Sequence, residues 1–391
     1  MEGNFDRRII IGVELEAYSI ETGDNRIGRK LSSPKRGVSE YDEGFTRDSS
    51  IGSEYNSRPF STVREALFLL RSGLRKYLRT LYEVPFTNPH AHRVPLLVGA
   101  WTDRTAGTHL HVSIQGRRMS HKDAVSLSSH VHDHLPLLIA LGANSPVWGR
   151  ELTPCESNRI IEGTETYFNP LPRGKLASGK TTEMCYSHAL GDKPPTLEIR
   201  VPDSNLPQFA VASLCLVKAI CLRWLRGGGA SNLIRHKDYL RARIGAAASG
   251  MRARLCWKGQ WMPAGRYLDR FLLVHREEFE AMDVPDEIND VLRLARCGFT
   301  GSRILREAVL LVQQSHPQTW QEHFAERYVR GLQEVLSGNT LTDFASALGV
   351  KLPVVEGKDS YKDVRHFCCS GYQAPLITPA AGSRHPTGRW S

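Results

Sequence analysis

The stretch Gly107–Ile114, GTHLHVSI, places two histidines two residues apart inside an apolar, β-branched run. Because side chains alternate across a β-strand, His109 and His111 share one face, and Leu110 and Val112 occupy the other. A buried face seldom carries imidazoles, since each ring nitrogen needs a hydrogen-bond partner. The stretch therefore predicts a strand with one apolar and one polar face. Taken alone, it fits an edge strand with its histidines in water better, because short alternating runs are common.

Two other runs show the same alternation. In GVELE, Glu14 and Glu16 share a face opposite aliphatic side chains, and in TLEIRV, Glu198 and Arg200 do the same. A further acidic stretch, DSSIGSEYN, contains Glu54. Surface charge on an exposed sheet explains any one of these strands, but it explains three together poorly.

The polar faces predict a site for a divalent cation and phosphate. Like charges two residues apart on a strand repel each other, so Glu14 and Glu16 favour a cation beside them. Magnesium takes carboxylate oxygens and commonly holds nucleotide phosphates as well. A histidine can complete such a site, and an arginine can neutralise a phosphoryl group during its transfer.

The order of the expected elements predicts an α+β protein, because strands come first and helices later without regular alternation. Strands are expected at 9–20, 107–114 and 195–202 and an extended segment at 50–56; helices are expected from Thr62 and at 121–142, 208–225, 265–282, 286–296, 302–314 and 318–337. Three glycines at 227–229 predict a hinge. We therefore expect a catalytic region over 1–226, a helical region over 227–370 that packs on the same domain, and a Pro/Gly-rich tail over 371–391.

Composition narrows the class of protein. The 391 residues include 41% hydrophobic and 24% charged residues, which is ordinary for a globular protein. We expect no membrane span, because no run approaches the apolar length that one requires. The eight cysteines form no CxxC pair, and the first residues lack the pattern of a secretory signal, so we expect reduced thiols, no zinc site and a cytoplasmic location. The net charge of +10 is concentrated in the basic stretch 223–258.

Five motifs occur in a familiar order: GVELE, DSSIGSEYNSRPF, GTHLHVSI, LLIALGANSPVWG and TLEIRVPDS. In this order and spacing they resemble the glutamate–cysteine ligase family of carboxylate–amine ligases, particularly its smaller bacterial branch. The resemblance implies a curved, mainly antiparallel sheet of the glutamine synthetase type, shaped as a funnel and packed with helices. It also implies ATP with Mg²⁺ (or Mn²⁺), and an amide bond, for example a γ-glutamyl bond, made through an acyl phosphate.

The resemblance also assigns residues. Metal ligands are expected at Glu14, Glu16, Glu54, His109 and Glu198. Nucleotide contacts are expected from Glu54, Asn56 and Arg200, and catalytic roles for Arg200, Glu198 and His109. Asp48 and His111 are assigned to the substrate side, and we expect His111 to support the ligands. Arg159 lies in the stretch ESNRIIEGTETYFNPLPRG, where it either holds a substrate carboxylate or is an ordinary surface arginine.

Other functions stay open at this point. A ligase or amidase that acts on a protein or peptide side chain, as in the prokaryotic ubiquitin-like protein ligases, fits the same fold. A nucleotide-binding module without turnover fits the motifs as well. Nucleic acid is not expected as a partner, because that interpretation rests on charge alone. The expected partners are a small carboxylate and an amine (an amino acid or a peptide), and a homodimer is left open.

Overall fold

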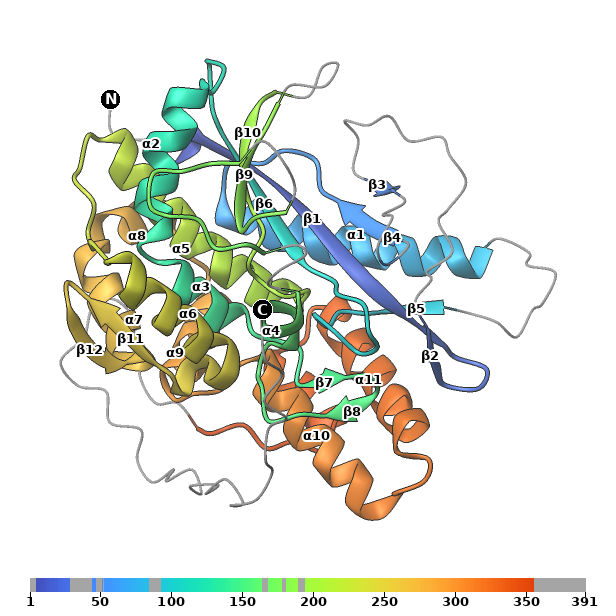
Figure 1. The fold of residues 1–391 in the computed structure, drawn as a ribbon. Helices are drawn as coiled ribbons and strands as arrows, with labels where there is room; N and C mark the ends of the chain where they lie inside the picture. Colours follow the sequence, from blue (N-terminus) through green and yellow to red (C-terminus); the bar gives the residue numbers. More distant parts are fainter. Residues whose placement is uncertain are drawn as a thin grey trace, which may run out of the picture.

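The computed structural model describes residues 5–28, 44–46, 51, 53–83, 93–163, 168–177, 181–188 and 194–354. In this part of the chain, a twisted sheet of eight strands lies at the centre, with the strand order β3-β4-β1-β6-β10-β9, and β2 and β5 pair with the far end of β1 (Figure 1). The strands are β1 (Ile9–Glu21), β2 (Arg26–Gly28), β3 (Gly44–Thr46), β4 (Ser53–Asn56), β5 (Arg93–Leu96), β6 (Thr108–Ile114), β9 (Met184–Ser187) and β10 (Thr196–Ile199). Every pairing among these strands is antiparallel. The expected α+β class with a curved antiparallel sheet is confirmed.

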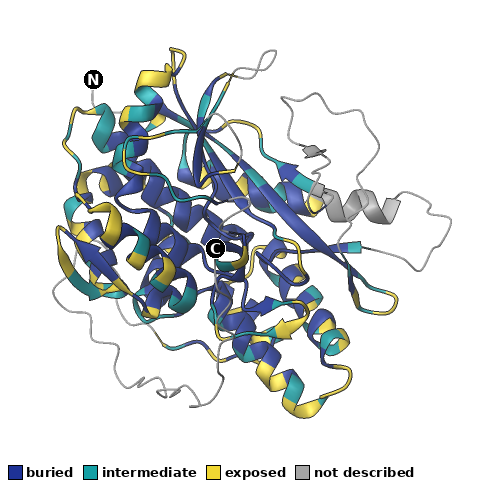
Figure 2. Ribbon diagram, viewed as in Figure 1, coloured by how far each residue is buried: buried dark blue, intermediate teal, exposed yellow. Residues whose placement is uncertain are grey.

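One face of the sheet is buried against helices. Val13 and Leu15 of β1 and Leu110 and Val112 of β6 are at most 2% exposed. The helix α5 (Pro207–Leu225) contacts β1 and is almost entirely buried (Figure 2). Period-two alternation in the strands thus sends aliphatic side chains to one side and leaves the other side to the polar residues.

Twelve α-helices lie within the described ranges. Besides α5, they are α1 (Val63–Glu83), α2 (His121–His132), α3 (Leu135–Gly142), α4 (Asn158–Glu162), α6 (His236–Ser249), α7 (Ala264–Val274), α8 (Arg276–Met282), α9 (Asp286–Arg296), α10 (Gly301–Ser315), α11 (Trp320–Ser337) and α12 (Leu341–Ala347). Beyond the glycine hinge, α6 packs on α3, and α9 packs on α5. The helical second half is confirmed, while the three-part division of the chain stays a prediction.

Some boundaries differ from those expected. The helix expected over 121–142 is two helices, and the chain turns between them at Asp133 and His134. Pro136 lies in the first turn of α3, where its missing N–H costs nothing; inside a continuous helix it would break a hydrogen bond. The sequence pattern did not predict α6 or the hairpin of β11 (Arg254–Trp257) and β12 (Gln260–Pro263).

The expectation that no run is long and apolar enough to span a membrane is wrong for α5. By length and composition Pro207–Leu225 meets that test, but 83% of its apolar window is buried inside the protein. Lys218, in the middle of this helix, is 1% exposed and donates to the carbonyl of Ser61. The helix is the core helix of the described structure.

Five of the described cysteines are free: Cys155, Cys185, Cys215, Cys221 and Cys256. Cys297 is disulfide-bonded, so the expectation of reduced thiols is wrong for this residue.

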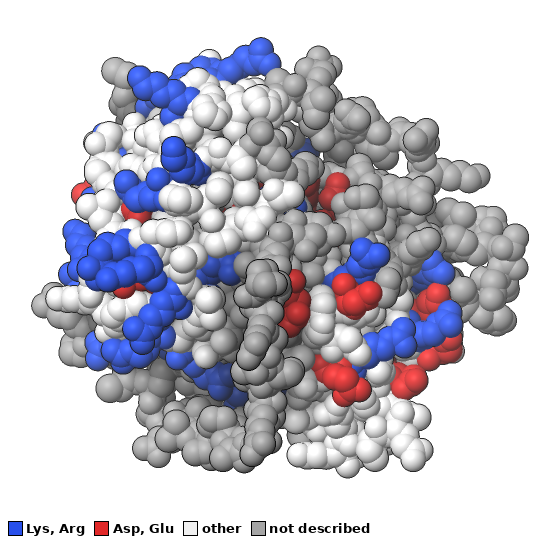
Figure 3. Space-filling view, viewed as in Figure 1, with Lys and Arg blue, Asp and Glu red and all other residues white. Residues whose placement is uncertain are grey.

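Four of the seven arginines of the basic stretch have acidic partners, one of them within the stretch itself. The ion pairs are Arg226 with Glu277 and Glu278, Arg235 with Asp238, Arg243 with Glu183, and Arg252 with Glu156. Lys and Arg still gather on the surface at the left of Figure 3, over α6, α7 and the β11–β12 hairpin. These four arginines therefore have partners within the fold and need no nucleic acid to balance them.

Candidate active site

The strand register brings the polar faces of the motifs into one surface. Glu14 of β1 lies opposite His109 of β6 on one side and Asn56 of β4 on the other. On the next row, His111 lies opposite Glu198 of β10. Residues nearly 200 positions apart in the chain therefore share one side of the sheet.

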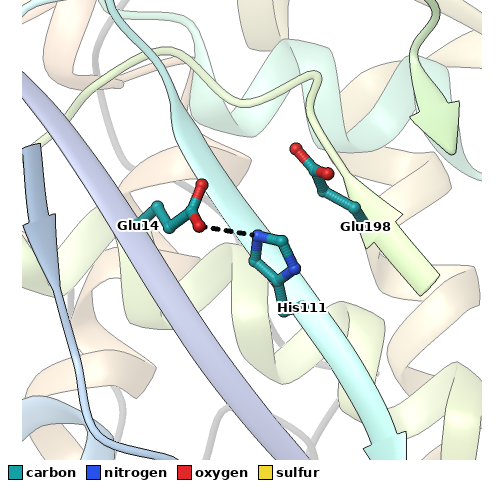
Figure 4. Close-up of side chains that lie close together, drawn as sticks. All are labelled: Glu14, His111 and Glu198. Carbon is teal, nitrogen blue, oxygen red and sulfur yellow. Dashed lines mark ion pairs between the residues drawn. The ribbon is translucent and has the colours of Figure 1, made fainter. Parts of the chain in front are cut away.

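Glu14, His111 and Glu198 form a cluster that can hold a metal ion. One ligand atom from each lies within 4.8 Å of the others, and the three side chains point toward one another (Figure 4). The His111 Nε2 atom lies 3.3 Å from Oε1 of Glu14. Two carboxylates and an imidazole suit a hard divalent cation such as Mg²⁺ or Mn²⁺. The donor set therefore fits the expected metal.

Two further side chains orient this cluster, and the sequence analysis missed both. Thr196 Oγ1 lies 3.0 Å from Nδ1 of His111, and the Cys185 thiol donates to Oε2 of Glu198 at 3.2 Å. A metal-bound imidazole commonly holds a partner on its other nitrogen, which is the place of Thr196. Alternation would have found Thr196, because it lies two residues before Glu198 on the same face.

His109 and His111 differ in surroundings in a way the sequence did not predict. His109 is 3% exposed, and its Nδ1 lies 3.3 Å from Oε2 of Glu14 and 3.7 Å from Oε1 of Glu198. Burial, followed by the charge of Arg200, lowers the pKa of His109 to about 4 against the opposing effect of the carboxylates. The metal cluster contains His111 and not His109. In this group the candidate ligand is His111, whereas the sequence assigned ligation to His109 and support to His111; which histidine binds the ion stays a prediction.

The carboxylates of the cluster are held in their charged form. Burial raises the pKa of Glu198, but His111, His109 and Arg200 lower it to about 2 overall. Burial also opposes ionisation of Glu14, yet the two imidazoles hold its pKa well below the usual value. Charged carboxylates are the form that binds a cation.

Glu16 and Glu54 lie opposite each other in the β1–β4 register. Glu16 Oε2 accepts from the backbone N–H of Gly107 at 2.5 Å, and Glu54 Oε1 accepts from Asn56 Nδ2 at 3.3 Å. Directly opposed like charges are unfavourable, and a cation between them would relieve the repulsion. The pair is on the predicted face, next to the metal cluster but outside it.

The remaining expected residues fall in three different places. Arg200 is 7% exposed and donates to Oε1 of Glu198, so it lies within the polar face. Arg159 is 1% exposed, and its Nη1 donates to backbone carbonyls, which does not support the expected contact with a substrate carboxylate. Asp48 lies outside the described residues.

A cavity of about 620 Å³ opens beside the cluster. Its lining includes Glu14, Asn56 and His111 together with apolar groups of Ile10, Pro59 and Pro194. A space of this size accommodates a ligand such as a nucleotide, with apolar walls for a ring system and polar groups that fix its orientation. Arg117 and Arg118 lie at its rim, where Arg117 pairs with Asp123.

Comparisons of sequence place the chain near glutamate–cysteine ligases. The model of glutamate–cysteine ligase family 2 matches residues 96–162, which contain GTHLHVSI and LLIALGANSPVWG. A curated relative, the putative glutamate–cysteine ligase 2-1 of Rhodococcus jostii, is 28% identical over 176 residues. That match covers 40% of this chain and 47% of the relative, so it spans about half of the relative's length. The resemblance drawn from the motifs is confirmed.

Comparisons of structure extend the likeness to most of the chain. The complex of the prokaryotic ubiquitin-like protein Pup with its ligase PafA matches with a TM-score of 0.59 and 15% identity, over 90% of this chain and 82% of that one. A bifunctional glutathione synthetase from Pasteurella multocida matches with 0.54 and 12% identity, over 88% and 56%. Glutamate–cysteine ligase from Francisella tularensis, in complex with AMP, matches with 0.50 and 12% identity, over 88% and 92%. At these identities the likeness shows a shared fold.

Proposed function

We propose that the protein is an ATP-dependent carboxylate–amine ligase that makes an amide bond through an acyl phosphate. The observation that carries the proposal is the cluster of Glu14, His111 and Glu198, with Arg200 beside it, next to a cavity of nucleotide size. The fold shared with solved ligases and the match to the glutamate–cysteine ligase family model support it.

The reaction needs the groups that this face presents. A carboxylate is a poor electrophile, so one of its oxygens first attacks the γ-phosphorus of ATP, and ADP leaves. The amine then attacks the acyl carbon, loses a proton, and displaces phosphate. Negative charge grows on the phosphoryl oxygens in the first step and on the tetrahedral carbon's oxygen in the second, and fixed positive groups stabilise it.

Each residue of the face has a proposed part in this chemistry. Glu14, His111 and Glu198 would hold a divalent ion, which supplies positive charge to the phosphates. Arg200 is held by Glu198, so its guanidinium is fixed in place before the reaction. Thr196 and His109 keep a ligand each in orientation. Asn56 lines the cavity beside Glu14 and would contact the nucleotide.

Product analysis tests the proposal and its alternatives together. The protein is incubated with ATP, Mg²⁺ and pools of amino acids. Glutamate is tested first, because the curated relative is a putative glutamate–cysteine ligase, and peptides are then added as acceptors. Mass spectrometry of nucleotides and products should show ADP with a new amide, and Glu198→Gln should abolish both. AMP as product would contradict the acyl-phosphate route. Nucleotide binding without any product would indicate a binding module.

A further inference from the structure

We propose that Arg159 is a positioning residue that fixes the orientation and tautomer of His109, and through it the carboxylate of Glu14. Arg159 also holds the end of the β10 segment that carries Arg200. The kinetic consequence rests on the proposed function, whereas the effect on His109 can be measured without any turnover. Sequence reasoning placed Arg159 on the substrate; its contacts place it behind the site instead.

The side chain of Arg159 is fully enclosed by the protein. Its Nη1 donates to the carbonyl of Arg200 at 2.9 Å and lies 3.3 Å from those of Val201 and Pro202. Its guanidinium carbon lies 4.1 Å from the ring centre of Phe168. A planar guanidinium with several fixed donors suits a row of carbonyls, which a lysine could not match. Arg159 therefore fixes the backbone that immediately follows β10.

The other terminal nitrogen of Arg159 reaches His109. Arg159 Nη2 lies 3.5 Å from Nε2 of His109, and arginine carries only donors. In the proposed arrangement His109 Nε2 accepts this contact and the proton lies on Nδ1, 3.3 Å from Oε2 of Glu14, because the carboxylate oxygen near Nε2, Oε1 of Glu16, is 3.9 Å away and beyond hydrogen-bond distance. Both ring nitrogens are used in this arrangement, so neither is left for a metal ion. The other oxygen of Glu14, Oε1, faces His111 in the metal cluster.

A glycine makes this approach possible. A Cβ atom at Gly107 would lie 2.1 Å from Nη2 of Arg159 and 2.7 Å from its guanidinium carbon. Any other residue at this position would force the guanidinium to shift, and it would also crowd the ring of His109, whose Nε2 lies 3.0 Å from the same Cβ position. The glycine that opens the run GTHLHVSI is thus explained by the arginine packed on it.

The charge of Arg159 is balanced by a second buried group, Asp203, which is 1% exposed. The Asp203 carboxylate accepts from Ser145 Oγ at 2.6 Å and from Ser157 Oγ at 2.9 Å. Ser145 Oγ also accepts from the backbone N–H of Arg159 at 3.2 Å. These bonds tie the segment before α4 to the end of β10 and leave Arg159 little freedom to move.

Histidine ¹⁵N spectra of the protein without nucleotide test the tautomer directly. The signals of His109 are assigned by comparison with His109→Gln. In the unsubstituted protein we expect an Nδ1-protonated ring; an Nε2-protonated ring would overturn the proposal. Arg159→Lys and Gly107→Ala should both shift or broaden these signals, and Arg296→Lys, at a half-buried arginine that ends α9 and pairs with Asp269, should not. Unchanged His109 signals in either folded site variant would also overturn it.

Kinetics test the consequence for the reaction. With the ligase assay in hand, Arg159→Lys should lower kcat about 10- to 100-fold, as for other residues that orient a metal ligand, while Arg296→Lys should lower only the thermal stability. An altered His109 spectrum with unchanged kcat would overturn the catalytic part of the proposal. If no substrate is turned over by the unsubstituted protein, the proposed function fails, and the spectra still decide the place of Arg159.

Discussion

Replacing Arg200 by alanine separates a catalytic role from a structural one. The guanidinium pairs with Glu198, whose side chain is fully buried. The pKa of Glu198 is about 2, against 4.5 for an ordinary glutamate. Because one pKa unit corresponds to about 1.4 kcal/mol, the surroundings favour the charged over the neutral carboxyl group by about 3 kcal/mol more than water does. His111 and His109 contribute to this more than Arg200 does. Arg200→Ala leaves the buried Glu198 carboxylate with both imidazoles, so it should cost on the order of 1–2 kcal/mol of folding free energy, less than the about 3–5 kcal/mol expected when a buried charge loses its sole partner.

The catalytic loss should be larger. If the guanidinium stabilises charge on the transferring phosphoryl group, kcat should fall on the order of a hundredfold or more, with a much smaller change in the affinity for ATP. Arg200→Lys should recover part of the activity, because a point charge cannot reproduce a planar fork. Urea denaturation followed by circular dichroism measures the first loss, and steady-state ADP release measures the second. Near-normal kcat in the folded alanine variant would refute the catalytic role and leave Arg200 as a structural partner of Glu198.

Three other predictions concern the metal ion, the two histidines of the site and the buried His275. Mg²⁺ or Mn²⁺ together with ATP should raise the melting temperature, since ligands that bind only the native state stabilise it; tight ATP binding that ignores a chelator would contradict this. His111→Ala should weaken metal-dependent ATP binding, measured by calorimetry, more than His109→Ala does, and the reverse order would restore the assignment expected from sequence. The free energy of unfolding should fall as the pH drops from 6.5 toward 4. Burial lowers the pKa of His275 to about 4 in the folded protein, so over this pH range the unfolded chain binds a proton that the folded protein does not. The folded state should lose about 3 kcal/mol of stability by pH 4. His275→Gln should flatten the dependence of the urea midpoint on pH over that range, and an unchanged slope would show that His275 does not cause it.

The sequence predicted the strands that carry the site, β1, β4, β6 and β10, because alternation is a local signal, but it did not predict β3, β5 and β9 of the same sheet. Glu14, Glu198 and the two histidines had to share a face once their strands were known, and the antiparallel register then brought them together. The break between α2 and α3 was readable in principle from Pro136, but an apolar helical pattern on both sides of it masked the signal.

The roles of individual site residues depend on distances that no local pattern contains. His109 and His111 are equivalent in spacing, but their neighbours differ: Arg159, 50 positions away, packs on His109, and Thr196 lies beside His111. Arg159 looked like a surface or substrate residue, since its burial is created by the segments around Gly107 and Arg200. Such contacts join segments that are distant in the sequence, so they could be identified only in the folded structure.

Isotope transfer from a labelled carboxylate tests the acyl-phosphate route most directly. The protein is incubated with ATP, Mg²⁺, an amine and carboxylates that carry ¹⁸O in both oxygens, and the released phosphate is analysed by mass spectrometry. Because a carboxylate oxygen attacks the γ-phosphorus and leaves with it, each phosphate released with a new amide should contain one ¹⁸O atom. Unlabelled phosphate alongside amide formation, or ¹⁸O found in AMP, would contradict the mechanism.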